Sequence, residues 1–190
     1  RAACRFTPSC SQYTKDAITK YGVVRSYMEF LLDCGFNSLQ GTREKTGLSL
    51  ALGSNEITLL ELVRAFSIFP NDGVLKEIQI NQQTKNKDKQ VIKTDTARII
   101  CDFLSDKAAQ SLGFGNAKVF NTEYPSIFKT GTANQYQDII ALAATKEYTV
   151  GVWLGNLNGE TVIKKTGSSI PALIARNILD YLTLPQLEQL

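Results

Sequence analysis

Two stretches in the first half of the chain place apolar residues at the three- and four-residue steps of an amphipathic helix. The first covers residues 11–32, with Gly22 as a candidate interruption and Gly35 as its end. The second covers residues 57–69 and is stopped by the Pro-Asn-Asp-Gly turn at residues 70–73. The pattern therefore predicts a helix, a loop, and a second helix that ends in a tight turn.

Two further helices are expected later in the chain. Thr94 or Asp95 is the expected N-cap of one, which runs to about residue 104 with its apolar residues on one face. The other is opened by one of two serines just before a proline and covers about residues 168–182. Between residues 81 and 93 the chain holds four lysines and few apolar groups, which indicates a solvated loop or a hairpin connection.

The pattern changes after Pro125, where short runs rich in β-branched and aromatic residues predict three strands. A Lys-Glu pair between the second and third runs is typical of a tight hairpin, and residues 156–159 end the third. Helices are therefore expected to cover an antiparallel sheet in an α/β (α+β) fold. The three runs are residues 127–132, 139–145 and 148–154.

The composition of the chain excludes several classes of function but does not indicate a particular one. The 190 residues are 43% hydrophobic and carry a net charge of +3, which is enough for one core and does not indicate nucleic-acid binding. The longest apolar stretch is broken by two charged residues, so membrane attachment is expected only through sequence not present here. The four cysteines lack Cys-x-x-Cys spacing and histidine is absent, so we expect neither a metal nor a cofactor, and serine chemistry without an imidazole base.

The segment around Lys129 is the place where residue types and spacing fit a known acyl-transfer site. Lys129 on a strand would place an ammonium beside a substrate carboxylate, and Thr130 would offer it a hydroxyl. Gly131 would leave room for a peptide, and the backbone N–H of Thr132 could serve an oxyanion hole. Taken alone, Lys-Thr-Gly is also compatible with an ordinary strand that has an exposed lysine and a glycine bulge.

The surrounding sequence resembles the transpeptidase domain of penicillin-binding proteins. The resemblance is carried by FKTGTANQYQD at residues 128–138, YTVGVWLGN at residues 148–156 and the Gly-Leu-Ser-Leu-Ala-Leu-Gly loop that opens residues 47–74. It covers about residues 27–190 and is closest to the C-type of the class A proteins, so it implies the C-terminal part of a penicillin-binding/β-lactamase-like fold. It also implies a serine acyl-enzyme, a peptidoglycan stem peptide ending in D-Ala-D-Ala as substrate, and inhibition by β-lactams.

That mechanism needs a Ser-x-x-Lys motif, in which a lysine one helical turn after the serine takes its proton. The literal match in the sequence is Ser126 with Lys129, but it lies on the predicted strand and reuses the lysine of the Lys-Thr-Gly motif. The nucleophile is therefore expected before residue 1. No turnover is expected from this chain. The family's Ser-x-Asn motif would fall near Ser9, where a serine replaces the asparagine. Ser9 is therefore the candidate catalytic residue, although it could equally begin the first helix.

The N-terminal segment resembles a different family. ACRFTPSCSQYTKDAITKYGVV at residues 3–24 is similar to the membrane protein insertion efficiency factor family, YidD. We therefore expect residues 1–25 to be a segment joined to a partial transpeptidase domain at residues 26–190. The alternatives are a YidD-like insertion factor and a non-catalytic peptidoglycan-binding module. The transpeptidase resemblance implies the extracytoplasmic, periplasmic face of a bacterial inner membrane.

Overall fold

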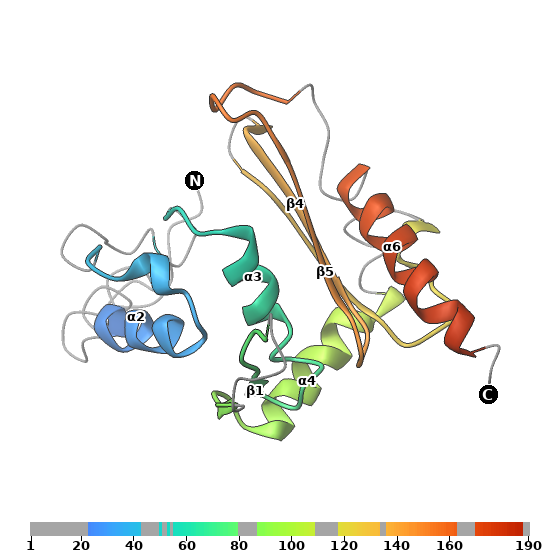
Figure 1. The fold of residues 1–190 in the computed structure, drawn as a ribbon, viewed down its shortest axis with the longest axis horizontal. Helices are drawn as coiled ribbons and strands as arrows, with labels where there is room; N and C mark the ends of the chain where they lie inside the picture. The colour runs from blue at the N-terminus through green and yellow to red at the C-terminus, as the bar shows by residue number, and fades with distance from the viewer. Residues whose placement is uncertain are drawn as a thin grey trace, which may run out of the picture. The chain divides into compact units, whose positions relative to one another are not determined.

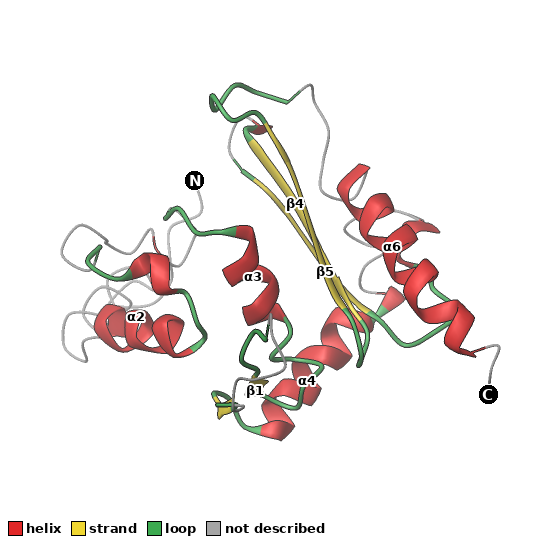
Figure 2. Ribbon diagram, in the orientation of Figure 1, coloured by secondary structure: helices red, strands yellow, loops and turns green. Residues whose placement is uncertain are grey.

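The computed structural model of the chain describes residues 23–42, 50, 53, 55–79, 87–108, 118–133, 136–162 and 170–187. The chain divides into two compact units, Arg1–Ile57 and Thr58–Leu190. Figure 1 traces the elements in chain order, and Figure 2 shows which of them are helices and strands. None of the helices in these ranges has the length and apolar content to cross a membrane.

The described part of the first unit is built on the helix α2 (Val23–Asp33) and the short 3₁₀ helix η1 (Asn37–Leu39). Gly35 ends α2 with φ of 95°, and the N–H groups of Gly35 and Phe36 donate to the carbonyls of Leu32 and Leu31. This pair of bonds is a Schellman motif, which favours glycine at the left-handed position. The predicted end of the first helix at Gly35 is confirmed, while residues 11–22 of that helix lie outside the described residues.

The second unit is organised around a three-stranded antiparallel sheet in the order β3 (Ile127–Thr132), β4 (Asp138–Ala144) and β5 (Thr149–Gly155). The turn from β4 to β5 is closed by the N–H of Thr145, which donates to the carbonyl of Tyr148. The three predicted strands and the hairpin between the last two are confirmed, with β4 and β5 each shifted by one residue. The fold is mixed α and β with an antiparallel sheet, as the sequence predicts.

Helices lie on both faces of this sheet (Figure 1). The helix α6 (Ile170–Leu187) packs on one face through small residues, forming a core with Phe128 of β3 and with Ala141 and Ala143 of β4. On the other face a core joins Ile127, Leu142 and Ala144 to residues of α3 (Leu59–Phe66) and α4 (Thr94–Ser105). Because neighbouring strand residues point to opposite faces, residues 127 and 128 define the two faces of β3.

The helix α3 starts and ends at residues whose local chemistry explains its length. Thr58 accepts a hydrogen bond from the N–H of Glu61 and donates its own N–H to the Glu61 carboxylate, a capping box. After Phe66 the chain enters the expected turn, where Asp72 and Gly73 have φ of 54° and 90°. The helix is therefore shorter at both ends than the apolar run of residues 57–69.

The turn at Asp72 also holds the start of α4. The hydrogen bond from Arg98, at 2.8 Å, lowers the pKa of the Asp72 carboxyl below its usual value. The Thr94 hydroxyl donates to the Asp72 carbonyl rather than to its own helix, and the residue at the N-cap position is Lys93, without a side-chain cap bond. The expectation that Thr94 or Asp95 caps this helix is therefore wrong, because the Thr94 hydroxyl is used to join the helix to the turn.

The polar stretch before α4 is a hairpin connection, as predicted. The short strand β1 (Val74–Leu75) pairs with β2 (Lys89–Gln90), in which both residues are exposed. Residues 80–86 between them lie outside the described residues. The last helix, α6, runs to Leu187 and is longer than the predicted end at residue 182, although Pro185 lies inside it.

Gly151 of β5 provides a direct test of the packing of α3 on the sheet. A Cβ atom at Gly151 would lie 2.2 Å from Cγ2 of Val63, so Gly151→Ala should lower the free energy of unfolding by about 1–3 kcal/mol through overpacking. Gly131→Ala is the matched control on the same face of the sheet, because a Cβ there meets no atom within 4 Å. Its effect should stay within about 0.5 kcal/mol in urea unfolding, and equal losses for the two variants would contradict the packing.

Candidate functional site at the edge of the sheet

The Lys-Thr-Gly sequence lies on β3, which is an edge strand in the described part of the sheet. Lys129 and Gly131 share the α3 and α4 face with Ile127, whereas Thr130 and Thr132 share the α6 face with Phe128. One edge of β3 is paired with β4 along its whole length. The side chains of Lys129 and Thr130 therefore leave opposite faces and can reach a common ligand only along the other edge.

The candidate binding residues on β3 differ in exposure. Lys129, Gly131 and Thr132 are exposed, and Thr130 is half-buried. The Lys129 ammonium donates a 2.6 Å hydrogen bond to the carbonyl of Thr130. A Cβ on Gly131 would meet no atom within 4 Å, so the strand can be approached closely beside Lys129. The exposure and the open space at Gly131 make this strand a candidate for contact with an extended peptide.

Asp138 and Trp153 form a second polar contact on the Lys129 face. The register pairs Gly131 with Ile140, and Ile140 with Trp153, so these three residues lie in one row across the sheet. The indole Nε1 of Trp153 donates to the Asp138 carboxylate at 2.8 Å. The ring lies over Gly155, where a Cβ would come within 2.4 Å of Cζ2 of Trp153. The glycine therefore allows the indole to reach Asp138.

Backbone contacts hold the tip of the sheet beyond Thr132. The N–H of Ala133 donates to the carbonyl of Asp138 at 2.8 Å, and Tyr136 adopts a φ of 57° in the connection between them. The carbonyl of Tyr136 accepts from the N–H of Val162 at 3.0 Å, and the Gln137 amide donates to the carbonyl of Gly159. The connection after β3 is thus tied to the loop after β5, which fixes where the Lys-Thr-Gly strand ends.

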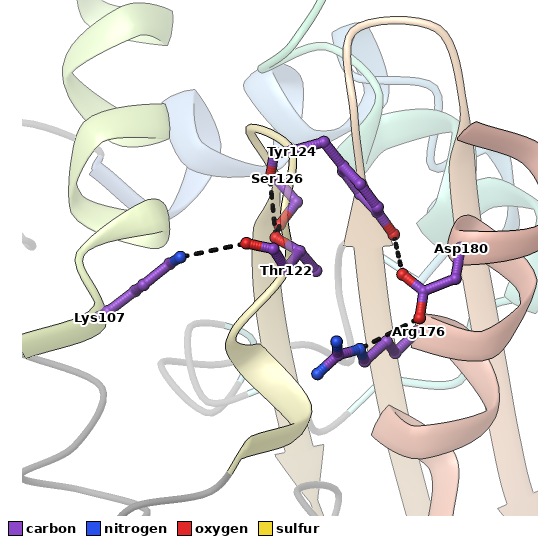
Figure 3. Close-up of polar contacts among 6 residues, drawn as sticks. All are labelled: Lys107, Thr122, Tyr124, Ser126, Arg176 and Asp180. Carbon is purple, nitrogen blue, oxygen red and sulfur yellow. Dashed lines mark hydrogen bonds and ion pairs between the residues drawn. The ribbon is translucent and has the colours of Figure 1, made fainter. Parts of the chain in front are cut away.

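Ser126, the serine of the literal Ser-x-x-Lys match, lies in the segment before β3 and is hydrogen-bonded there (Figure 3). The Thr122 hydroxyl donates to the carbonyl of Tyr124 and also lies 2.7 Å from the Ser126 hydroxyl. A hydroxyl has one proton, so Ser126 is the donor in this second bond. Because Ser126 and Lys129 are three residues apart at a strand, their side chains also leave opposite faces. Ser126 is therefore a structural residue and not a nucleophile activated by Lys129.

Tyr124 and Asp180 are the residues near β3 that the sequence pattern does not reveal. The Tyr124 hydroxyl donates to the Asp180 carboxylate at 2.6 Å, and Arg176 donates to the same carboxylate at 3.2 Å (Figure 3). Burial, followed by the bond to Asp180, raises the pKa of Tyr124 well above its usual value. Asp180 stands 56 residues after Tyr124 in the chain, so no local motif could have indicated the pair.

The remaining site predictions fall elsewhere. Ser9 lies outside the described residues, so its catalytic role stays a prediction. Within the described ranges, no group of three or more acidic or cysteine side chains is placed to bind a metal ion. Lys129, Thr130, Gly131 and Thr132 lie together on one strand, and their binding roles stay predictions.

Comparison with known proteins identifies the class to which this arrangement belongs. The family model of the penicillin binding protein transpeptidase domain matches residues 34–180. The chain therefore belongs to the penicillin-binding protein transpeptidase family. The model of YidD, a proposed membrane protein insertion efficiency factor, matches residues 1–33.

Individual relatives agree with both matches. Penicillin-binding protein 1C of Escherichia coli (strain K12) is 26% identical over 128 residues, which is 66% of this chain and 16% of the relative. Penicillin-binding protein 4 of Bacillus subtilis (strain 168) is 34% identical over 119 residues, 57% of this chain and 19% of the relative. The chain thus spans less than a fifth of the length of these two proteins. A proposed membrane protein insertion efficiency factor of Mycobacterium tuberculosis (strain ATCC 25618 / H37Rv) is 62% identical over 24 residues, 13% of this chain and 20% of the relative.

The contact between Asp138 and Trp153 can be tested by tryptophan fluorescence, because Trp153 is the single tryptophan of the chain. Asp138→Ala removes the acceptor of the indole N–H. We expect the emission maximum to move to longer wavelength and acrylamide quenching to increase, since the freed ring becomes more accessible to water. The control is Asp102→Ala, which changes an exposed aspartate on α4. Emission that responds equally to both substitutions would contradict the contact.

Proposed function

We propose that this chain is the substrate-holding part of a serine D,D-transpeptidase, and that it binds the D-Ala-D-Ala end of a peptidoglycan stem peptide along β3. The observation that carries the proposal is the exposed Lys129 on an edge strand, with open space over the neighbouring Gly131. Membership of the penicillin-binding protein transpeptidase family supports it. β-Lactams are proposed as ligands of the same edge.

The geometry of an edge strand favours a peptide ligand. An extended peptide can add to the edge of a sheet through main-chain hydrogen bonds, while side chains on the strand select the sequence. Lys129 and Thr130 flank this edge from opposite faces of the sheet. A terminal carboxylate placed at the edge would lie within reach of both the ammonium and the hydroxyl, and charge-assisted bonds of this kind are the strong ones.

The proposed chemistry is acyl transfer from the stem peptide to an amine through a serine ester. The serine hydroxyl attacks the carbonyl of the penultimate D-alanine, and its proton leaves with the terminal D-alanine. An amine then attacks the ester carbonyl, the bond to the serine oxygen breaks, and the amine's proton returns to the serine. In this scheme the backbone N–H of Thr132 stabilises the oxyanion, as donors at such positions do. Ser126 cannot supply the nucleophile, because its hydroxyl is bonded to Thr122. We therefore propose that the nucleophile is a serine other than Ser126.

The organisation of the chain and its location are part of the proposal. We propose that residues 1–25 are a segment joined to a partial transpeptidase domain in residues 26–190, acting at the extracytoplasmic face of a bacterial membrane. The two family matches, at residues 1–33 and 34–180, support a join in this region. The non-catalytic alternative, a module that only binds peptidoglycan, uses the same edge of β3 without acyl transfer.

A role for the N-terminal segment as an insertion factor is the second candidate, favoured by the match of residues 1–33 to the YidD model. This role requires contact with a bilayer. In flotation with liposomes that contain anionic lipid, the candidate predicts that the full chain rises with the vesicles and that a chain lacking residues 1–33 does not. A full chain that stays at the bottom of the gradient would exclude it.

The transpeptidase proposal is tested by the affinity for N-acyl-L-Lys-D-Ala-D-Ala, measured by calorimetry. Lys129→Ala should weaken binding by about 10-fold, because a hydrogen bond to a charged group contributes about 1.5 kcal/mol or more. The matched control is Lys146→Ala, which removes an exposed lysine from the turn at the other end of the sheet. Binding should also be fully reversible. Equal affinities for the Lys129 and Lys146 variants, or the absence of binding, would contradict the proposal.

A further inference from the structure

The strand that carries Lys129 is anchored just before it begins. Residues 121–126 connect the 3₁₀ helix η3 (Lys118–Phe120) to β3, and side chains from both helical layers hold this segment (Figure 3). From the α4 side, the ammonium of Lys107 donates to the carbonyl of Thr122 at 3.2 Å and to Asn121 at 2.8 Å. From the α6 side, Asp180 accepts the Tyr124 hydroxyl at 2.6 Å. The segment is therefore held from both faces of the sheet.

The bond between Tyr124 and Asp180 is the anchor on the α6 side, and its donor is buried. Tyr124 is 6% exposed and lies in one core with Phe128, the residue that precedes Lys129, and with Leu179 of α6. A short bond from a buried hydroxyl to a carboxylate is charge-assisted, and removing either partner leaves a polar group without its bond in a poorly solvated place. Arg176 donates to the other carboxylate oxygen and so fixes the orientation of Asp180.

Such an anchor matters because, among the strands that the structure describes, only β4 pairs with β3, along one of its edges. In the described sheet its backbone pairs with β4, and its other edge is where the proposed ligand would add. The ladder fixes the register of β3 but resists twisting of the strand less than pairing on both edges would. A contact that fixes the start of β3 against α6 therefore also limits how far Lys129 can move.

We propose that Tyr124 and Asp180 are positioning residues for Lys129, which hold the start of β3 so that the ammonium stands where a ligand carboxylate binds. This inference rests on the proposed function for its ligand. A positioning role differs from a purely structural role in one respect. Tyr124 affects binding only because it helps to keep Lys129 in place. Loss of the Tyr124 hydroxyl should therefore weaken binding only while Lys129 is present.

The experiment is a double-mutant cycle on the full chain with N-acyl-L-Lys-D-Ala-D-Ala as the probe, at a temperature at which every variant is folded by circular dichroism. Tyr124→Phe removes the hydroxyl and keeps the ring. We expect it to weaken binding by about 5-fold in the wild-type background and by less than about 2-fold in the Lys129→Ala background, as coupled sites do. An equal loss in both backgrounds, or no loss in either, would overturn the inference.

The control is Thr183→Val on the same helix, where a buried hydroxyl meets no hydrogen-bond partner among the residues that the structure describes. It should leave binding unchanged. A second readout is independent of the ligand: hydrogen exchange of the β3 backbone amides should be faster in Tyr124→Phe than in Thr183→Val. If the probe fails to bind the wild-type chain, the proposed function fails, and the exchange rates still decide the positioning role. Equal exchange in the two variants would show that Tyr124 does not hold β3.

Discussion

The antiparallel pairing of β3 with β4 is the interaction on which the site depends. It fixes the register that places Lys129 and Gly131 on one face. In the described sheet β4 pairs with one edge of β3, and the ligand is proposed at the other. A strand paired on one edge needs further support if it is to present a side chain at a defined position. The structure provides that support before the strand, through Tyr124 and Asp180, and after it, through the backbone of Asp138.

Small residues make this arrangement compatible with close packing. Gly151 allows Val63 of α3 to lie against the sheet, and Ala172 and Ala175 bring α6 close to the other face. Because protein interiors are packed to the density of organic crystals, an added methyl group at such a place would clash with the neighbouring side chains. Gly131 has the opposite property, since the space beside it is open. On one face of the sheet, Gly151 thus allows close packing of a helix, whereas Gly131 leaves the strand accessible.

The sequence predicts the strands, the turn at Asp72 and the end of the first helix at Gly35, because each depends on local periodicity or on residues with special backbone freedom. It does not predict the N-cap of α4, where Thr94 bonds to the distant carbonyl of Asp72. Nor does it show which face of α6 packs, because exposed residues such as Ile174 and Ile178 are as apolar as the buried Leu179. Contacts between distant segments decide these features. The candidate residues of the Lys-Thr-Gly strand can be picked out of the sequence because they are consecutive. Tyr124 is missed because its partner, Asp180, lies 56 residues away.

The central claim is that a peptide carboxylate binds along the edge of β3 that faces away from β4. A titration of the ¹⁵N-labelled chain with N-acyl-L-Lys-D-Ala-D-Ala, followed by two-dimensional amide spectra, tests it most directly. The account predicts saturable shifts concentrated at residues 129–132, with weaker effects at Ile140 and Trp153, which lie in the same row of the sheet as Gly131, and none in the turn at Lys146. Shifts that centre on β5 or on α6, or that fail to saturate, would contradict it.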